Sequence, residues 1–335
     1  MSTSNKIRGY AVVIVNEKEV DNSGFKERKG ASNDSDFIQA SFCNKLGFKW
    51  LNQSQSRDLK KSQWIHSGDP PKECDCLTCK IQKTDHSKSE CFLLVISTHG
   101  REEEGQQIIR FSDVKKIYLA DVIDTLSDDK CPSLVGIPRI VVLQTCRTNN
   151  KLPEELRDDQ GFEVTVGIGQ LNIKDGNDND SELAVPEKGQ GDNQDMNDPS
   201  SGNDLSSGND LSSEDESDVD PEDDIFYSAC AIPNNFLIVY PTTAGKRSKR
   251  NTRKGSWLIE ELNDVICKHD FKTEPTMNFL KVLTKTAGQV AKRTTKKDKF
   301  MNSPCIVHKL LCPLLFTAPE SNEMAGPSTS DKPAL

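Results

Sequence analysis

Short, continuous runs of apolar residues recur along the chain, and they predict the buried strands of a sheet. Each run is rich in Val, Ile and Leu, with little alternation between apolar and polar positions. This pattern is typical of strands that are covered on both faces, as in a parallel sheet. The predicted strands span residues 10–16, 92–98, 140–145, 236–240 and 305–315.

Between these strands, apolar residues recur three and four positions apart, which predicts amphipathic helices. We expect one helix with Asn33 as its N-cap and a stop at Gly47, and another with Ser256 as its N-cap. The alternation of strands and helices predicts an α/β fold with a central, mainly parallel sheet flanked by helices. The apolar helix positions are Phe37, Ile38, Phe42 and Leu46, then Tyr118, Val122, Ile123 and Leu126, then Trp257, Leu258, Leu262, Val265 and Ile266, and finally Met277, Leu280, Leu283, Ala287 and Val290.

The composition changes sharply in the second half of the chain. The net charge is −9, but residues 174–224 hold 18 Asp and Glu against two Lys, so this stretch carries −16 and the rest +7. A segment of low hydrophobicity and high like charge cannot offset the entropy that it would lose on ordering. We therefore expect two folded parts joined by a disordered acidic linker and followed by a disordered tail. These parts span residues 1–171, 172–224 (linker), 225–316 and 317–335 (tail).

The chain has 11 cysteines, and neither end carries a signal peptide or a long apolar span. A reducing intracellular compartment is therefore expected, with most cysteines acting as small buried apolar residues. We expect a cytoplasmic protein and leave entry into the nucleus open.

Two of the predicted strands end in residues with catalytic chemistry. His99 and Gly100 follow the run at 92–98, and Cys146 follows the run at 140–145. Residues just past the ends of parallel strands share one crevice. The imidazole and the thiol could therefore meet, which is the minimum arrangement for a thiolate nucleophile. For an isolated Cys–His pair, two ordinary strand-end residues are the more frequent interpretation, so the surrounding motifs decide.

The segment around the cysteine is Gln144-Thr145-Cys146-Arg147-Thr148, and His99 lies 47 residues before Cys146. It is close to the Gln-Ala-Cys-Arg/Gln/Gly-Gly signature of caspases, whose histidine lies about 50 residues upstream. The chain therefore resembles the caspases, over residues 8–171 and 225–316. Further blocks in the family's order are Glu27–Gly30, Asp85–Ser87, Ser248–Asn251, Gly255–Trp257 and Pro304–Val307.

The resemblance implies a caspase-type α/β sandwich with residues 1–171 as a large subunit and residues 225–316 as a small one. It implies a cysteine endopeptidase that cleaves proteins after aspartate through a thioester. Cys146 would be the nucleophile, His99 the general acid and base, and Gly100 an oxyanion donor. The residues implied to bind the substrate aspartate are Arg28, Gln144, Ser248 and Arg250. Two guanidiniums suit this task because they always carry charge and can hold a carboxylate through paired hydrogen bonds.

The resemblance also implies a biological setting. The first strand begins near Tyr10, so we expect no upstream recruitment domain and an executioner-like zymogen in apoptosis, activated by an upstream protease. We expect a homodimer of cleaved large and small subunits in which the last strand pairs across a two-fold axis. No cofactor, membrane or nucleic-acid partner is expected. Cleavage is expected after Asp218 of Asp215-Glu216-Ser217-Asp218, with Asp220 and Asp175 as lesser sites.

Four residues depart from the caspase pattern. Thr145 and Thr148 stand in the cysteine loop, where Thr148 would be strained if its position required a positive φ. Arg247 and Lys249 replace the aromatic residues of a neighbouring subsite, which favours a polar or acidic preference there. These departures leave open a catalytically inactive caspase-like regulator that binds an active relative. Six of the ten residues at 245–254 are Lys or Arg, which leaves polyanion binding open as well.

A compact group of cysteines, Cys74, Cys76 and Cys79, lies near His66 and His86. A structural zinc site usually pairs two ligand clusters at a defined spacing, and this stretch has one. We therefore expect no metal here, and inert or redox-active thiols instead.

Overall fold

The structure is a computed structural model of the 335-residue chain. The expected linker at 172–224, the candidate cleavage residues Asp175, Asp218 and Asp220, and the tail from residue 320 lie outside the described residues. The structure describes residues 6–66, 73–149, 153–158, 232–296 and 299–319.

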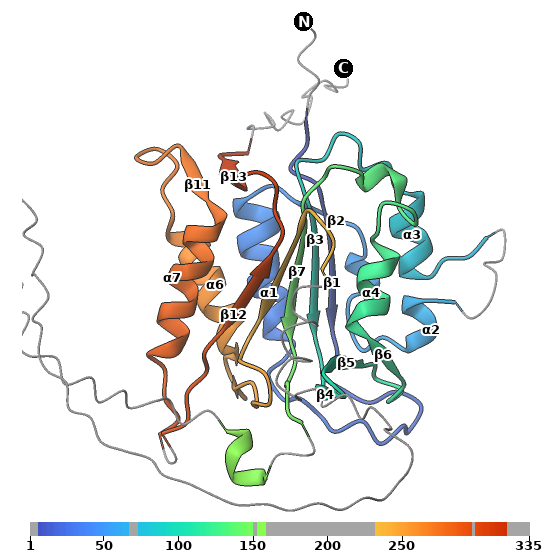
Figure 1. Cartoon of the computed structure of the whole chain (residues 1–335), viewed down its shortest axis with the longest axis vertical. Helices are drawn as coiled ribbons and strands as arrows, with labels where there is room; N and C mark the ends of the chain where they lie inside the picture. The colour runs from blue at the N-terminus through green and yellow to red at the C-terminus, as the bar shows by residue number, and fades with distance from the viewer. Residues whose placement is uncertain (1–5, 67–72, 150–152, 159–231, 297–298, 320–335) are drawn as a thin grey trace, which may run out of the picture. The chain divides into compact units, whose positions relative to one another are not determined.

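A six-stranded sheet forms the centre of the described fold (Figure 1). Its strand order is β12-β8-β7-β3-β1-β2, and every neighbouring pair is parallel except β12 with β8. The prediction of a mainly parallel sheet is therefore confirmed. The strands are β1 (Tyr10–Val15), β2 (Lys49–Trp50), β3 (Phe92–Ser97), β7 (Arg139–Gln144), β8 (Phe236–Tyr240) and β12 (Cys305–His308).

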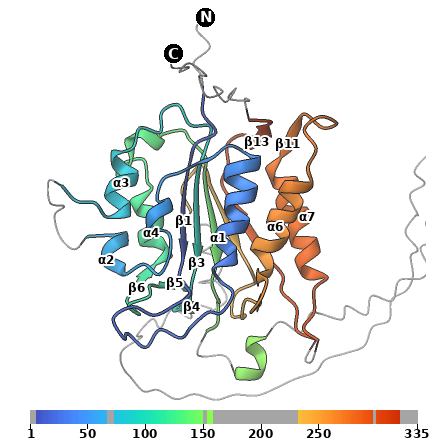
Figure 2. The ribbon, with the colours of Figure 1, turned by 180° about the vertical axis from the view of Figure 1, so that it is seen from behind.

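Helices cover both faces of this sheet, as Figure 2 shows from the opposite side. Alternate residues of each strand supply two separate cores: Val13 and Val95 pack under α1, α6 and α7, whereas Ile14 and Leu94 pack under α2, α3 and α4. No helix in the described segments has both the length and the apolar character that a membrane span needs. The helices are α1 (Asn33–Ile38, continued by the π-helical segment η1, Gln39–Lys45), α2 (Lys61–Trp64), α3 (Leu77–Lys83), α4 (Leu119–Thr125), α6 (Trp257–Lys268) and α7 (Phe279–Ala291).

The predicted final strand at 305–315 is too long. After β12 the chain leaves the central sheet and forms β13 (Leu315–Thr317), which pairs antiparallel with β11 (Thr276–Asn278). Pro313 lies between the two strands and has no N–H to donate to a ladder. Burial of Phe316 holds β13 at its separate place in the core.

Two helix starts also differ from prediction. Asn33 is the first residue of α1, not its N-cap, because Ser32 already has a helical backbone conformation. Met277, expected on a helix, lies in β11, and Asn278 caps α7 with its side chain. Met277 continues the apolar spacing of α7 because it is buried in the same core as that helix.

Short strands complete the fold around the ends of the central sheet. A three-stranded antiparallel sheet begins at the residue after His99, so its position fixes how the chain leaves β3. A two-stranded ribbon precedes α6. These strands are β4 (Gly100–Glu103), β5 (Gln106–Arg110), β6 (Lys116–Tyr118), β9 (Arg250–Asn251) and β10 (Gly255–Ser256).

Candidate active site

The register of two neighbouring strands brings the candidate catalytic residues to one end of the sheet. Ser97 of β3 is paired with Gln144 of β7, and both strands run in the same direction. His99 and Cys146 each lie two residues beyond this pair. The N–H of Thr98 donates to the Gln144 carbonyl at 3.1 Å, so the pairing persists into the two loops. Both residues therefore lie at the same end of the sheet.

The ring of His99 is oriented by a backbone carbonyl. Nε2 lies 2.6 Å from the carbonyl oxygen of Lys26, and the ring packs 4.8 Å from that of Phe25. A carbonyl can only accept, so Nε2 carries the proton, and Nδ1 has the free lone pair that a base requires. Burial, with the positive charges of Arg28 and Arg250, lowers the pKa of His99 to about 4 despite the opposing effect of the Lys26 carbonyl. The imidazole is therefore neutral at pH 7.

Cys146 lies in a loop that is tied to both halves of the chain. Its half-buried Sγ is 3.7 Å from Oγ of Ser248, 102 residues away. Its carbonyl accepts a hydrogen bond from Nε2 of Gln107 at 3.2 Å, and the same amide donates to the Ile108 carbonyl at 2.9 Å. The nucleophile is thus positioned by the sheet that follows β3 and by the second folded part.

Gly100 packs closely against the cysteine segment. A Cβ at this position would lie 2.5 Å from the Ile108 carbonyl oxygen and 2.9 Å from Cβ of Thr145. Real Cβ atoms essentially never make contacts that short, so any side chain here would force the Ile108 backbone or its neighbours to shift. This leaves the Gly100 backbone beside the loop of Cys146, as an oxyanion donor requires.

Arg28 is the buried cation of the site. Its side chain is 2% exposed, with Nη1 donating to the Asn16 carbonyl at 2.6 Å and Nη2 donating to Oγ of Ser97 at 3.0 Å. Burial, followed by repulsion from Arg250, lowers the pKa of Arg28 to about 10. The guanidinium is still charged at pH 7, and it lies directly beneath the strand ends.

Asp34 is a functional neighbour that the sequence did not reveal. Its carboxylate is fully buried and accepts hydrogen bonds from Oγ of Ser97 at 2.6 Å, Oγ of Ser256 at 2.6 Å and N–H of Ser256 at 2.9 Å. Burial raises the pKa of Asp34, while these bonds and Arg28 oppose the rise. Ser256 is the N-cap of α6, as predicted, but its hydroxyl binds Asp34 and not the helix.

Arg250 reaches the site from the second folded part. Its Nε donates to the Lys29 carbonyl at 3.0 Å, across 221 residues of sequence. The approach is possible because Gly30 has a φ of +82° and a Cβ there would lie 2.6 Å from the Thr252 carbonyl oxygen. Burial also lowers the pKa of Arg250, and Cys146 is among the groups whose charge acts on it. Arg250 is therefore close enough to Arg28 for the two charges to interact.

Gln144 ends β7 with a side chain that is 1% exposed. It shares a face of the sheet with its register partner Ser97, the residue that holds Arg28. Its Oε1 has no hydrogen-bond partner in the described part of the chain. Gln144 thus adds a buried amide on the face of the sheet where Ser97 contacts Arg28.

The fold accommodates Thr148, Arg247 and Lys249, whereas Oγ1 of Thr145 is buried without a hydrogen-bond partner in the described part of the chain. Thr148 does not have a positive φ, and it forms an extended bridge with Gly245, so the strain expected of a threonine does not arise. Arg247 and Lys249 both pair with Asp158, at 3.0 and 2.5 Å. The basic subsite is therefore largely neutralised by the chain itself.

The basic run at 245–254 is mostly engaged with protein groups, which weakens its case as a polyanion site. Four of its six cations donate to carboxylates or carbonyls of the described chain. They are Lys246, Arg247, Lys249 and Arg250.

One further group of side chains could hold a metal. His66 lies beside Cys74, Cys76 and Cys79, whereas His86 is buried elsewhere and binds the Ile81 carbonyl. This group is separate from the strand ends that carry His99 and Cys146.

These observations define a class of protein: an α/β fold with a cysteine and a histidine at the carboxyl ends of neighbouring parallel strands, close to two arginines. The comparisons with known proteins agree. A family model described as the caspase domain matches residues 8–315. The chain therefore belongs to the caspase family, whose members are cysteine proteases directed to aspartate that act in apoptosis and are usually dimers.

The similarity to individual relatives is distant but extensive. Caspase-6 of Rattus norvegicus is 25% identical over 274 residues, which is 81% of this chain and 74% of that protein. Caspase-3 of Bos taurus is 24% identical over 266 residues, or 79% and 68% of the two chains. The crystal structure of caspase-1 from Spodoptera frugiperda superposes with a TM-score of 0.59 at 20% identity, covering 94% of this chain and 92% of that one.

Proposed function

We propose that this protein is an active cysteine endopeptidase that cleaves proteins after aspartate and acts as an executioner in apoptosis. The observation that carries the proposal is the convergence of Cys146, His99 and the buried Arg28 at one end of the sheet. The register of β3 and β7 supports it, because that register places the base and the nucleophile at equal offsets from paired residues.

The pocket supports the choice of aspartate as substrate. Arg28 and Arg250 repel each other, and both guanidiniums have a lowered pKa. A carboxylate placed between them relieves this repulsion and accepts charge-assisted hydrogen bonds from both. Asp34 supplies one buried negative charge for the two guanidiniums, so a substrate aspartate would balance the second positive charge, which a neutral asparagine cannot do.

The reaction would follow from the orientation of His99. Nδ1 removes the thiol proton of Cys146, and the thiolate forms a bond to the carbonyl carbon of the scissile peptide. Backbone N–H groups of Gly100 and Cys146 would stabilise the oxyanion, at about 3 kcal/mol for each donor. His99 then passes its proton to the leaving amine as the C–N bond breaks. Water finally hydrolyses the thioester and releases the acid.

Hydrolysis of a fluorogenic Asp-Glu-x-Asp peptide tests this function. We expect the cleaved protein to hydrolyse this peptide and not the matched peptide that ends in asparagine. The Cys146→Ala variant should lose activity about 10³-fold or more. A cleaved, folded protein without hydrolysis would contradict the proposal and favour the inactive regulator.

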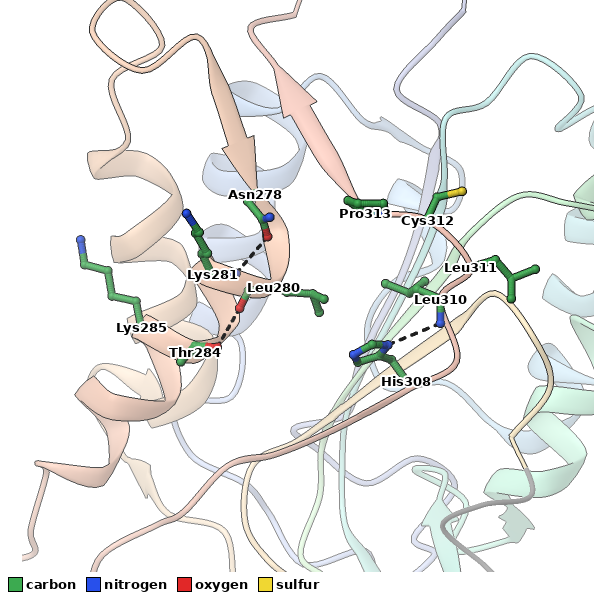
Figure 3. A pocket seen from close by; sticks show the side chains of 10 residues that line it. All are labelled: Asn278, Leu280, Lys281, Thr284, Lys285, His308, Leu310, Leu311, Cys312 and Pro313. Atoms are coloured by element: carbon green, nitrogen blue, oxygen red, sulfur yellow. Dashed lines mark hydrogen bonds between the residues drawn. The ribbon is translucent and has the colours of Figure 1, made fainter. Parts of the chain in front are cut away.

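We also propose a homodimer that forms along the open edge of β12, as in the family. An exposed strand edge with apolar residues is a site for pairing with another chain. A cavity of about 690 Å³ lies beside this edge, between α7 and the segment after β12 (Figure 3). Leu311 on its rim is 66% exposed. A second copy related by a two-fold axis would cover both features.

We also propose that the chain matures by cleavage of its linker in the cytoplasm. Residues 1–171 and 225–316 would become the large and small subunits after an upstream protease cuts the linker, first after Asp218. The described cysteines are all free thiols, which is consistent with a cytoplasmic protein.

A further inference from the structure

Four side chains near the start of α3 bring metal-binding atoms to one point. Nδ1 of His66 lies 3.5 Å from Sγ of Cys76, 3.8 Å from Sγ of Cys74 and 3.4 Å from Sγ of Cys79. The sulfur atoms of Cys74 and Cys76 are 3.3 Å apart, and all four ligand atoms lie within 4.8 Å of one another. We propose that these residues form a structural zinc site of the Cys₃His type.

The distances match the chemistry of zinc. With Zn–S bonds of about 2.3 Å and Zn–N bonds of about 2.0 Å, the edges of a tetrahedron are about 3.8 Å for S···S and about 3.5 Å for S···N. The three N···S separations lie within about 0.3 Å of the tetrahedral value, the Cys74–Cys76 separation is about 0.5 Å short of the S···S value, and no pair of ligand atoms is more than 4.8 Å apart. Three thiolates and one imidazole are also the soft donor set that selects zinc over magnesium or calcium.

The alternative of a disulfide fits the cluster less well. All three cysteines are free thiols, and the 3.3 Å between Cys74 and Cys76 is far from the S–S bond length of about 2.05 Å. A disulfide would also leave the imidazole and the third sulfur without a role. A single zinc ion uses all four groups.

The site has the setting of a structural metal and not of a catalytic one. Cys76 and Cys79 are each 4% exposed, and four protein ligands leave no open position for a water. The ligands join the chain after α2 to the start of α3, and Oγ1 of Thr78 already donates to the Trp64 carbonyl at 2.7 Å. Figure 1 shows α2 and α3 together on one face of the central sheet. Zinc would fasten this pair of short helices over the core.

The charge of the complex is also compensated. Zinc with three thiolates carries a net charge of −1, and binding displaces the thiol protons into water. Lys83 lies at the site, with Nζ donating to the Cys74 carbonyl at 3.1 Å. The positive charge of Lys83, held beside the ligand Cys74, favours the anionic zinc complex over the metal-free cluster.

The experiment uses the full chain with Cys146→Ala, so that the catalytic thiol neither binds metal nor cuts the linker. We expect elemental analysis to find about one zinc per chain after purification from zinc-supplemented medium. Cys76→Ser and Cys79→Ser in this background should lose the zinc, whereas Cys267→Ser, at an exposed cysteine of α6, should keep it.

A cobalt titration covers the case in which the serine variants do not fold. The full chain with Cys146→Ala, stripped of metal, should bind one equivalent of Co²⁺ and develop the visible bands of tetrahedral coordination and the ultraviolet band of thiolate-to-cobalt charge transfer. Zinc should displace the cobalt and raise the melting temperature. Absence of these bands, zinc content that Cys79→Ser leaves unchanged, or a Cys74–Cys76 disulfide in the freshly reduced protein would overturn the proposal. None of these readouts depends on peptidase activity.

Discussion

Ser97 couples the charges beneath the candidate active site. Its hydroxyl accepts a hydrogen bond from Arg28 and donates one to Asp34, so the buried cation and the buried anion both bind the same side chain.

Arg28 could be predicted from the sequence because it lies in one of the blocks that match the caspase pattern. Asp34 could not, since an acidic residue at the start of a helix has an ordinary explanation. Lys26 orients His99 through its backbone carbonyl, and a backbone contact cannot be predicted from the type of residue.

Replacing Asp34 by asparagine tests this coupling. An amide cannot accept hydrogen bonds from both serine hydroxyls and also balance Arg28, so we expect the free energy of unfolding to fall by about 1–3 kcal/mol. Asp36→Asn, on the same helix with a 76% exposed side chain, is the matched control and should change stability by less than about 0.5 kcal/mol. Urea denaturation measures both. Equal stability of the two variants would show that Asp34 is not a required counter-charge.

The low pKa of His99 predicts an unusual pH profile. The neutral imidazole is the base, so activity is lost as pH falls through the pKa of His99. The acid limb of kcat/KM is therefore expected near pH 4 and not near the usual 6.5. In the substrate complex the bound carboxylate offsets Arg28 and Arg250, so the limb of kcat should lie at higher pH.

Arg110 offers a variant for the same experiment, because its charge also lowers the pKa of His99. Arg110→Gln should move the acid limb of kcat/KM to higher pH while the pocket arginines stay in place. A limb near pH 6.5 that this substitution does not move would contradict the account of His99.

Among the elements, the strands formed by long apolar runs could be predicted from the sequence. The exact point at which one strand ends and the next begins could not. The strands β3 and β7 are unbroken apolar runs, so their parallel pairing, and with it the placement of His99 and Cys146 at one end of the sheet, could be predicted. The boundary between β12 and β13 could not, because the stretch between them is equally apolar and turns away at Pro313. The cluster that we propose as a zinc site was not predicted from the sequence, because its fourth ligand is the single histidine His66 and not a second ligand motif.

The exposed apolar edge beside β12 leads to a prediction about assembly. Leu311→Asp should place a charge in the dimer interface and convert the cleaved protein to a monomer with reduced activity. Val135→Asp is the control, because Val135 is similarly exposed, at 58%, next to the short helical turn Pro132–Leu134. Analytical ultracentrifugation distinguishes the outcomes. A dimer that survives Leu311→Asp would place the interface elsewhere.

At the scale of the whole molecule, the acidic segment at residues 174–224 is where we expect the cleavage that activates the protein. Residues 174–224 carry −16, and the rest of the chain carries +7. Replacing Asp175, Asp218 and Asp220 by alanine should leave a single chain after incubation with an active caspase, whereas the parent chain should give two subunits. Gel electrophoresis with mass determination of the fragments checks this. Two subunits from the triple variant would place the cleavage at another linker residue. A second variant with every linker aspartate replaced decides the point, because two subunits from it would refute cleavage after aspartate.

We propose that Cys146 is a nucleophile paired with His99 and that Arg28 and Arg250 bind the substrate aspartate. Active-site titration of the cleaved protein with a peptidyl aspartyl ketone tests both parts at once. We expect one equivalent of inhibitor per catalytic chain, attached to Cys146, with no labelling of Cys146→Ala and much slower labelling by the matched asparaginyl ketone. Failure to label the folded, cleaved protein, or equal labelling by both ketones, would contradict it.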